Sequence, residues 1–352
     1  MSSTAWKKHP LRSLICSPVE TSVLVSFVSG TEPLKAVLCE KFGTPKDLVV
    51  KDIDPPGPPA PGELQVNLKV RGIAFSDLVR MAGNYQDTRE PPYVVGGDGS
   101  GVVTAVGDEV AGFTTGDQVV APGGCVEIVN VPASAVTKLP DGIDLEAAAA
   151  FGNNYLTALH GLKLARLQSG ETLLVHGAAG GVGLAAVDMG KMMGARVIAT
   201  ASSDAKLEVV KEFGADEIIN YSDGFRDQVK ELTGGLGADV IYDPVGGDIF
   251  DESMRCIAPY GRILIVGFTS GRAALAKTNH LLVKDASVIG YSVGTLQQRR
   301  PELAREYADT LMDYLVKGRI KPHISHRFTM DEIVDAYQVI SDRQVIGKVL
   351  IL

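Results

Sequence analysis

Hydrophobic and polar positions follow two different patterns along the chain. From Leu34 to about Tyr155 short apolar segments alternate with turn residues, and residues 64–70 show the two-residue period of a half-buried strand. The proline-rich run 54–62 fits neither a helix nor a central strand, so we expect an exposed connection there. This first region is predicted to be an all-β barrel or sandwich. Further strands are expected at 35–38, 101–107 and 117–120.

From Thr172 onward the apolar runs become continuous, which is typical of parallel strands that are covered on both faces. Two of the stretches between them, 184–193 and 206–213, have one apolar face and end just before a glycine, as helices do. Strands that alternate with helices predict a doubly wound parallel sheet of the size that binds dinucleotides. Its six strands are expected at 172–175, 196–200, 217–219, 239–242, 262–266 and 287–291.

The C-terminal part of the chain continues with helices and a strand. A helix is predicted to begin at Pro301, because proline is favoured in the first turn, and to end at Gly318. A second helix near 331–340 and a last strand over 348–352 are expected to follow it.

Length and composition restrict the class of protein. A chain of 352 residues exceeds what one hydrophobic core usually serves, so two domains are expected. With 34 Lys and Arg against 42 Asp and Glu, the net charge of −8 argues against a generic nucleic-acid partner. The four cysteines lie far apart without a CxxC pair, which argues against a zinc–thiolate site or a disulfide scaffold and favours a reducing compartment.

The N-terminal residues 1–33 differ from the rest of the chain. Residues 1–19 contain Lys and Arg but no acidic residue, a weak likeness to an organellar transit segment, and an unstructured tail or a misplaced start codon is the alternative. An intracellular location is expected, and both the cytoplasm and the mitochondrion stay open. No apolar stretch approaches the roughly 20 residues that a bilayer span requires, so no membrane span is expected.

The segment 176–183, His-Gly-Ala-Ala-Gly-Gly-Val-Gly, joins a predicted strand to a predicted helix. Free N–H groups and the positive end of a helix favour a pyrophosphate at such a loop, and missing side chains let it approach. The glycine string alone is weak evidence, but its place between strand and helix favours a dinucleotide site over a tight turn without a ligand. The expected cofactor contacts in the loop are Ala178, Gly180, Gly181, Val182 and Gly183.

The end of the second predicted strand indicates which nucleotide is selected. Enzymes that select NAD usually have an acidic residue about 20 positions after the loop, which holds the ribose 2′-hydroxyl. Here Ser202 stands near that place and Lys206 follows, so a 2′-phosphate would be accepted and NADPH is predicted over NADH. Asp204 leaves an alternative open, because it either caps the helix or disfavours the phosphate. For Lys206, the alternative interpretation is an ordinary solvated helix residue.

From about Leu34 to Leu352 the sequence resembles the medium-chain dehydrogenase/reductase superfamily, and within it the zinc-independent quinone oxidoreductases, the zeta-crystallin-like branch. The resemblance implies an α/β fold in which a six-stranded doubly wound (Rossmann) domain, 156–291, is inserted into a GroES-like β-barrel domain. That barrel would consist of residues 34–155, completed by 292–352. The motifs that carry the resemblance lie at 72–77, 83–85, 107, 116–119, 155–158, 178–183, 219–221 and 243–246.

The resemblance also implies that no metal is bound. Zinc alcohol dehydrogenases of this superfamily have Cys-His where this chain has residues 74–75, and Gly-His-Glu where it has residues 96–98. A catalytic zinc needs three protein ligands, and of these positions only Asp98 keeps a ligand-type side chain. His323 and His326 are interpreted as solvated loop residues.

Matching positions imply contacts with the rest of the cofactor. The branch usually has Asn where this chain has Ala74, so one polar contact near the nicotinamide is missing here. The expected contacts are Ser202, Lys206, Tyr221 and Arg343 for the 2′-phosphate, Thr157 for the nicotinamide side, and the backbone of Val266, Gly267 and Phe268 for the carboxamide.

The combined expectation is an NADPH-dependent, metal-free reductase that transfers hydride to quinones or α,β-unsaturated carbonyls. Negative charge then builds on oxygen, and Tyr85 is the candidate donor near that oxygen. A side chain that only lines the site is the alternative interpretation of Tyr85. Asp77 is expected to fix the local turn. We also expect a homodimer, from the resemblance and because the apolar strand 287–291, left uncovered at the edge of the sheet, would favour aggregation.

Two alternatives stay open. A 2-enoyl-thioester (enoyl-CoA/ACP) reductase is similar around Tyr85, and the N-terminal segment would suit a mitochondrial one. The second alternative is a non-catalytic NADPH-binding protein, because Ala74 cannot make the polar contact that Asn usually makes at this position.

Overall fold

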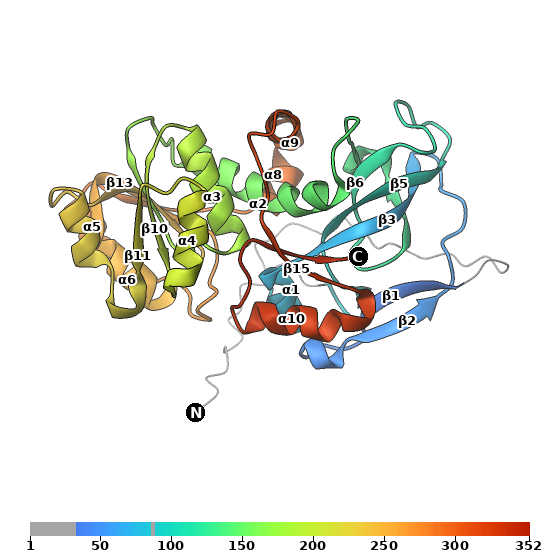
Figure 1. The fold of residues 1–352 in the computed structure, drawn as a ribbon, viewed down its shortest axis with the longest axis horizontal. Helices are drawn as coiled ribbons and strands as arrows, with labels where there is room; N and C mark the ends of the chain where they lie inside the picture. Colours follow the sequence, from blue (N-terminus) through green and yellow to red (C-terminus); the bar gives the residue numbers. More distant parts are fainter. Residues whose placement is uncertain (1–32, 86–88) are drawn as a thin grey trace.

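The structure, a computed structural model, describes residues 33–85 and 89–352. The expectation for residues 1–33 therefore lies outside the described residues, except for Pro33. Figure 1 shows two lobes side by side, with the long helix α2 (Leu145–Leu164) running between them.

One lobe contains a six-stranded sheet in which every neighbouring pair of strands is parallel. The order is β11-β10-β9-β12-β13-β14, so the direction of winding reverses between β9 and β12. This is the doubly wound order of dinucleotide-binding folds, and the predicted fold class is confirmed. The strands are β9 (Thr172–Val175), β10 (Arg196–Ala201), β11 (Glu217–Asn220), β12 (Ala238–Asp243), β13 (Ile257–Ile265) and β14 (Ser287–Gly290).

Helices cover both faces of this sheet. Successive residues of β9 point to opposite faces, so Leu173 belongs to the core shared with α2 and α3, while Leu174 belongs to the core shared with α5 and α6. This double burial explains the continuous apolar runs in the sequence. The helices of this lobe are α3 (Gly181–Met192), α4 (Asp204–Glu212), α5 (Arg226–Leu232), α6 (Gly247–Cys256) and α7 (Thr278–Leu282).

The strand β13 begins earlier than the sequence pattern predicts. The apolar run was expected from residue 262, whereas the strand starts at Ile257. Pro259, Tyr260 and Gly261 interrupt the hydrophobic pattern, and Tyr260 has a positive φ of 60°. The pattern therefore revealed only the second half of the strand.

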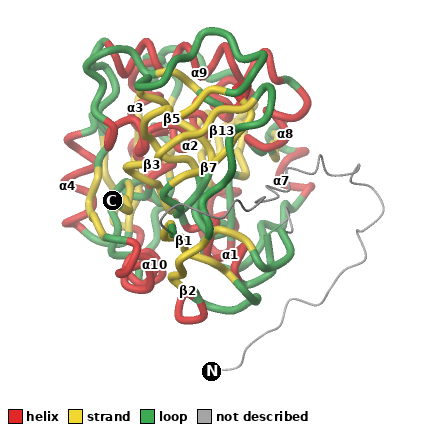
Figure 2. Tube along the Cα trace, turned by 90° about the vertical axis from the view of Figure 1, so that its right-hand side faces the viewer, coloured by secondary structure: helices red, strands yellow, loops and turns green. Residues whose placement is uncertain are grey.

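The other lobe contains a seven-stranded sheet in the order β15-β16-β3-β5-β6-β8, with β7 also paired to β3. Its last strand, β16, pairs antiparallel with β3, so the end of the chain lies in this lobe. Figure 2 shows β3, β5 and β7 together, with α9 above them and α10 below. The strands are β3 (Glu63–Ile73), β5 (Asp98–Val106), β6 (Gln118–Pro122), β7 (Ile128–Pro132), β8 (Thr137–Lys138), β15 (Ile324–Phe328) and β16 (Lys348–Ile351).

Smaller elements complete this lobe. A three-stranded sheet has the order β2-β1-β4. The elements are β1 (Leu34–Cys39), β2 (Val49–Ile53), β4 (Tyr93–Val94), α1 (Phe75–Met81), α8 (Val293–Arg299), α9 (Pro301–Val316) and α10 (Ile333–Ser341).

The prediction of strands and turns alone for residues 34–155 is wrong, because α1 and the first half of α2 lie there. The helix α2 packs against both lobes and buries residues on most of its sides, so it lacks the polar face that reveals a surface helix. Asp144 caps it by accepting a hydrogen bond from the N–H of Ala147 at 3.0 Å. The boundary expected between residues 155 and 156 falls inside this helix.

Candidate cofactor site and active site

The glycine loop follows β9 and leads directly into α3. Gly177 has a φ of 53°, and Gly180 is the N-cap residue of the helix. A Cβ atom on Gly183 would collide with the carbonyl oxygen of Gly177, so no larger residue fits there. Within the described part of the chain, no acceptor reaches the N–H groups of Val182 and Gly183. These free donors at a helix N-terminus are suited to bind an anion.

Buried hydrogen bonds fix the loop to the sheet. His176 contacts Thr200 through Nδ1 at 2.9 Å and Ser253 through Nε2 at 2.8 Å, and the N–H of Ala178 donates to the Thr200 carbonyl at 2.9 Å. Complete burial lowers the pKa of His176 to about 3, so this ring is neutral. The loop thus rests on the ends of β9 and β10.

Lys206 and Arg343 meet although they are far apart in the sequence. The ammonium of Lys206, in the first turn of α4, donates a hydrogen bond to the Arg343 carbonyl, and the Arg343 guanidinium donates to the Thr269 carbonyl at 3.2 Å. Burial, and then the charge of Arg343, lower the pKa of Lys206. Among residues 33–85 and 89–352 no carboxylate pairs with either cation. Two adjacent cations without an anion are suited to bind a phosphate group.

Asp204, whose role the sequence left open, is turned toward Asn220. The Asn220 amide donates to the Asp204 carboxylate at 2.8 Å, and Ser203 rather than Asp204 is the N-cap residue of α4. Ser202 and Tyr221 follow the neighbouring strands β10 and β11, so both lie at the carboxyl edge of the sheet, where dinucleotides bind in such folds.

The residues expected near the nicotinamide lie on α2 and after β13. The hydroxyl of Thr157 donates to the Asn153 carbonyl at 2.7 Å, which leaves its oxygen able to accept a further hydrogen bond. After β13, the N–H of Val266 donates to the Asp243 carbonyl at 3.0 Å. No acceptor in the described part of the chain reaches the N–H groups of Gly267 and Phe268.

Asn154 is a further residue at this site that the sequence analysis missed. It is buried within α2, and a Cβ atom on Gly181 would lie 2.5 Å from its Nδ2 atom. The amide therefore lies directly beside the glycine loop. The two adjacent asparagines in this mostly apolar helix gave no signal of this position, because only the packing of α2 against α3 brings Asn154 and Gly181 together.

Tyr85 lies in the barrel lobe, just after α1. Its ring centroid is 4.5 Å from the Arg80 guanidinium carbon, and Arg80 forms an ion pair with Asp77 at 3.2 Å. Asp77 accepts from the N–H of Ala74 at 2.8 Å, which fixes the turn that begins α1, as expected. No hydrogen bond or ring contact within residues 33–85 and 89–352 joins Tyr85 to the predicted cofactor residues. Its role as a donor stays a prediction.

Three observations concern other kinds of site. In the described residues, no group of three or more His, Cys, Asp or Glu side chains is placed to hold a metal ion. A hollow of about 580 Å³ lies along α5 and α6 and contains none of the predicted site residues. Over residues 33–85 and 89–352, helices with the length and apolar character needed to cross a membrane are absent.

A GroES-like lobe joined to a doubly wound sheet with a glycine loop defines the medium-chain dehydrogenase/reductase class. Two family models match the chain: the alcohol dehydrogenase GroES-like domain at residues 60–141 and the zinc-binding dehydrogenase domain at residues 181–309.

Individual relatives narrow this class further. The chain is 38% identical to the quinone oxidoreductase-like protein 2 homolog of Nematostella vectensis, over 97% of this chain and 94% of that protein. It is 34% identical to a quinone oxidoreductase of Pseudomonas aeruginosa, over 90% of this chain and 99% of that protein. Escherichia coli quinone oxidoreductase complexed with NADPH has a similar structure, with a TM-score of 0.83 and 29% identity over 90% of this chain and 99% of that chain. The chain belongs to the quinone oxidoreductase-like family.

Proposed function

We propose that this protein is an NADPH-dependent reductase that transfers hydride to quinones or α,β-unsaturated carbonyl compounds. The observation that carries the proposal is the pair Lys206 and Arg343, two cations without a carboxylate partner in the described residues, at the carboxyl edge of a sheet that also presents a glycine loop. The NADPH bound to Escherichia coli quinone oxidoreductase supports the same choice of cofactor.

Each part of the cofactor has residues suited to hold it. The free N–H groups of Val182 and Gly183 would bind the pyrophosphate, with Ala178, Gly180 and Gly181 shaping the loop around it. Lys206 and Arg343, together with Ser202 and Tyr221, would bind the 2′-phosphate. Thr157 and the backbone of 266–268 would orient the nicotinamide, which supplies the hydride.

The protein's own part in the reaction is orientation and charge stabilisation. Hydride addition to a quinone, or to the β-carbon of an enone, leaves negative charge on oxygen, and a hydrogen-bond donor near that oxygen lowers the barrier. Tyr85 is the proposed donor from the barrel lobe. The proposed reaction needs no metal ion, so the side chains at residues 74 and 96–98 need not act as metal ligands.

A side-by-side assay tests the proposal. We expect the purified protein to oxidise NADPH with an ortho-quinone and to act much less on a crotonyl thioester, with loss of absorbance at the NADPH band as the readout. Turnover of the thioester alone would show an enoyl-thioester reductase instead. NADPH binding without oxidation across a broad panel of quinones and enones would show a non-catalytic binding protein.

A further inference from the structure

Lys348, the first residue of β16, extends its side chain across a glycine of the neighbouring strand. In the register of β16 with β3, Leu350 lies opposite Gly72. A Cβ atom on Gly72 would lie 2.7 Å from Cε and 3.0 Å from Nζ of Lys348, and 3.1 Å from the Ala149 carbonyl of α2. The absence of a side chain at Gly72 therefore makes room for this lysine between the barrel sheet and α2.

Lys348 has no partner that neutralises it directly. In the described residues no hydrogen bond or ion pair reaches its ammonium or the carboxylate of Asp98. Asp77 also faces Lys348, but it already accepts from Ala74 and Tyr337 and pairs with Arg80. Burial lowers the pKa of Lys348, and the charges of Asp77, Asp98 and Cys125 oppose this shift.

Asp98 is the carboxylate left to accompany Lys348. Partial enclosure by protein raises the pKa of its carboxyl group, and the charge of Lys348 opposes that shift. Both side chains also keep contact with solvent, so an ammonium is available to a ligand there.

Two contacts relate the positions of Asp98 and Lys348 to the proposed cofactor site. A Cβ on Gly152 would lie 3.9 Å from the Asp98 carboxylate, whereas Thr157 marks the proposed nicotinamide side. At 1.5 Å per residue, about 7.5 Å of helix axis separates these two positions. Gly347, next to Lys348, donates to the Ala179 carbonyl of the glycine loop at 2.8 Å. The chain that carries Lys348 is therefore attached to the cofactor loop.

We propose that the ammonium of Lys348, accompanied by Asp98, stabilises the negative charge that develops on the substrate's carbonyl oxygen. This inference rests on the proposed function. In an enone, the hydride forms a C–H bond at the β-carbon, the π electrons of the C=C bond shift to give an enolate, and the nicotinamide is oxidised. The ammonium donates a hydrogen bond to the enolate oxygen, and water supplies the proton that completes the saturated ketone.

Substitution of Lys348 tests the inference on the full-length protein. We expect Lys348→Met to lower kcat/KM for an enone by about 10- to 100-fold, because a charge-assisted hydrogen bond to the transition state is lost. Lys348→Arg should recover most of this activity. The loss should be smaller with an ortho-quinone, whose reduced anion is more stable. The Kd for NADPH, measured by fluorescence titration, should stay within about twofold of the wild-type value.

Two further variants separate a catalytic role from a structural one. Lys69→Met removes an exposed lysine of β3 and should leave all constants unchanged. Gly72→Ala displaces the Lys348 ammonium without removing its charge, and it should lower turnover of the enone while NADPH binding is retained. This second variant keeps the test decisive if Lys348→Met does not fold.

The outcomes distinguish the inference from the function on which it rests. An active wild-type protein with equally active Lys348→Met and Gly72→Ala variants would overturn the role of Lys348 and leave the proposed function intact. Equal losses in the Met and Arg variants, accompanied by weaker NADPH binding, would also overturn it, since they indicate a structural lysine. A wild-type protein that binds NADPH but reduces neither acceptor would contradict both proposals.

Discussion

In the proposed cofactor site, the balance of charges around Lys206 and Arg343 is expected to decide which dinucleotide is accepted. Lys206 and Arg343 lie together, and no carboxylate in the described residues neutralises them. Asp204, two residues before Lys206, is hydrogen-bonded to Asn220. A phosphate on the adenosine ribose would relieve the repulsion between the two cations, whereas a free 2′-hydroxyl would not.

At this residue scale we predict that Lys206→Ala weakens NADPH binding by about 10- to 100-fold, because one charge-assisted hydrogen bond contributes about 1.5–3 kcal/mol. NADH lacks the phosphate, so its affinity should hardly change. Fluorescence titration with both nucleotides measures the two effects. Lys211→Ala, an exposed lysine of the same helix, is the matched control and should bind both nucleotides like the wild type. An equal loss for NADPH and NADH would mean that the 2′-phosphate lies elsewhere.

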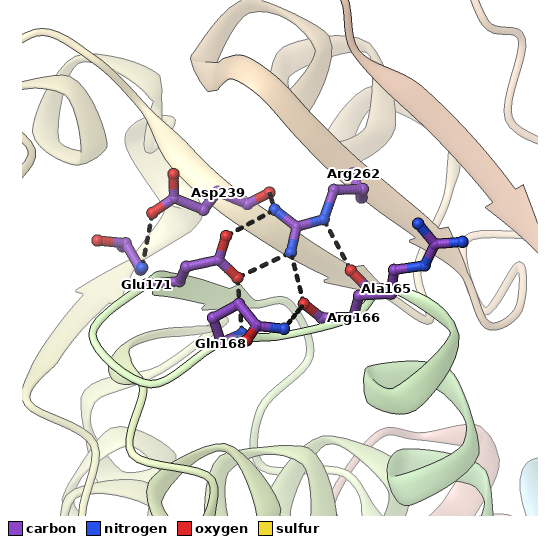
Figure 3. A network of polar contacts seen from close by, with 7 residues as sticks. Ala165, Arg166, Gln168, Glu171, Asp239 and Arg262 are labelled. Atoms are coloured by element: carbon purple, nitrogen blue, oxygen red, sulfur yellow. Dashed lines mark hydrogen bonds and ion pairs between the residues drawn. The ribbon is translucent and has the colours of Figure 1, made fainter.

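At the scale of elements, a polar network joins the end of α2 to the sheet (Figure 3). Arg262 of β13 forms two hydrogen bonds with Glu171, at 2.9 and 2.7 Å, and donates to the Ala165 carbonyl at 2.8 Å. It also donates to the Asp239 carbonyl of β12 at 3.2 Å. Arg262 thereby connects the segment before β9 to two strands, at the edge of the sheet opposite the glycine loop.

We predict that Arg262→Met lowers the free energy of unfolding by about 2 kcal/mol, because several partly buried acceptors lose their donor. Arg305→Met is the matched control. It breaks only an exposed pair with Asp309 on α9, so a loss of under about 0.5 kcal/mol is expected. Urea denaturation followed by circular dichroism measures both changes, and equal losses in the two variants would contradict the prediction.

The difference in the free energy of unfolding between the wild type and Arg262→Met should change with pH in a definite direction. Burial raises the pKa of Glu171, but hydrogen bonds from Arg262 and from the Gln168 N–H outweigh burial, and the net shift is downward. A carboxyl group with a lowered pKa stabilises the fold above its unfolded pKa of about 4.3 and loses that contribution as the pH falls through the folded value. The gap between wild type and Arg262→Met should therefore narrow in acid.

At the scale of the whole molecule, β14 is the last strand of the doubly wound sheet. Apolar side chains gather near it: Leu282 and Val283, in and after α7, are each 78% exposed, and Tyr260, whose N–H donates to the Lys284 carbonyl, is 73% exposed. An unpaired strand edge beside exposed apolar side chains favours association with a second copy.

We therefore predict a homodimer that forms through the β14 edge. Light scattering at micromolar concentration should give about twice the 37.2 kDa mass of the chain. Val283→Glu should shift the mass toward that of the monomer, whereas Val316→Glu, on the exposed face of α9, should not. A monomeric wild-type protein would contradict the prediction.

Elements that a local sequence pattern marks were predicted well. The continuous apolar runs identified all six parallel strands because burial on both faces leaves no polar positions in them. The glycine loop was evident because strand, loop and helix are contiguous in the chain. The helix α2 was missed, since its burial by both lobes removes the polar face on which the prediction depends.

The sequence by itself determined the buried strands and the glycine loop between strand and helix, because each is marked by residues close together in the chain. The tertiary structure alone decided which distant residues join them. Arg343 meets Lys206, and Lys348 lies beside Gly72, because the C-terminal segment returns to pair with β3, and Asn154 reaches the loop because α2 packs against α3. Such placements follow from the closure of the whole chain around its cores, which no local pattern of residues contains.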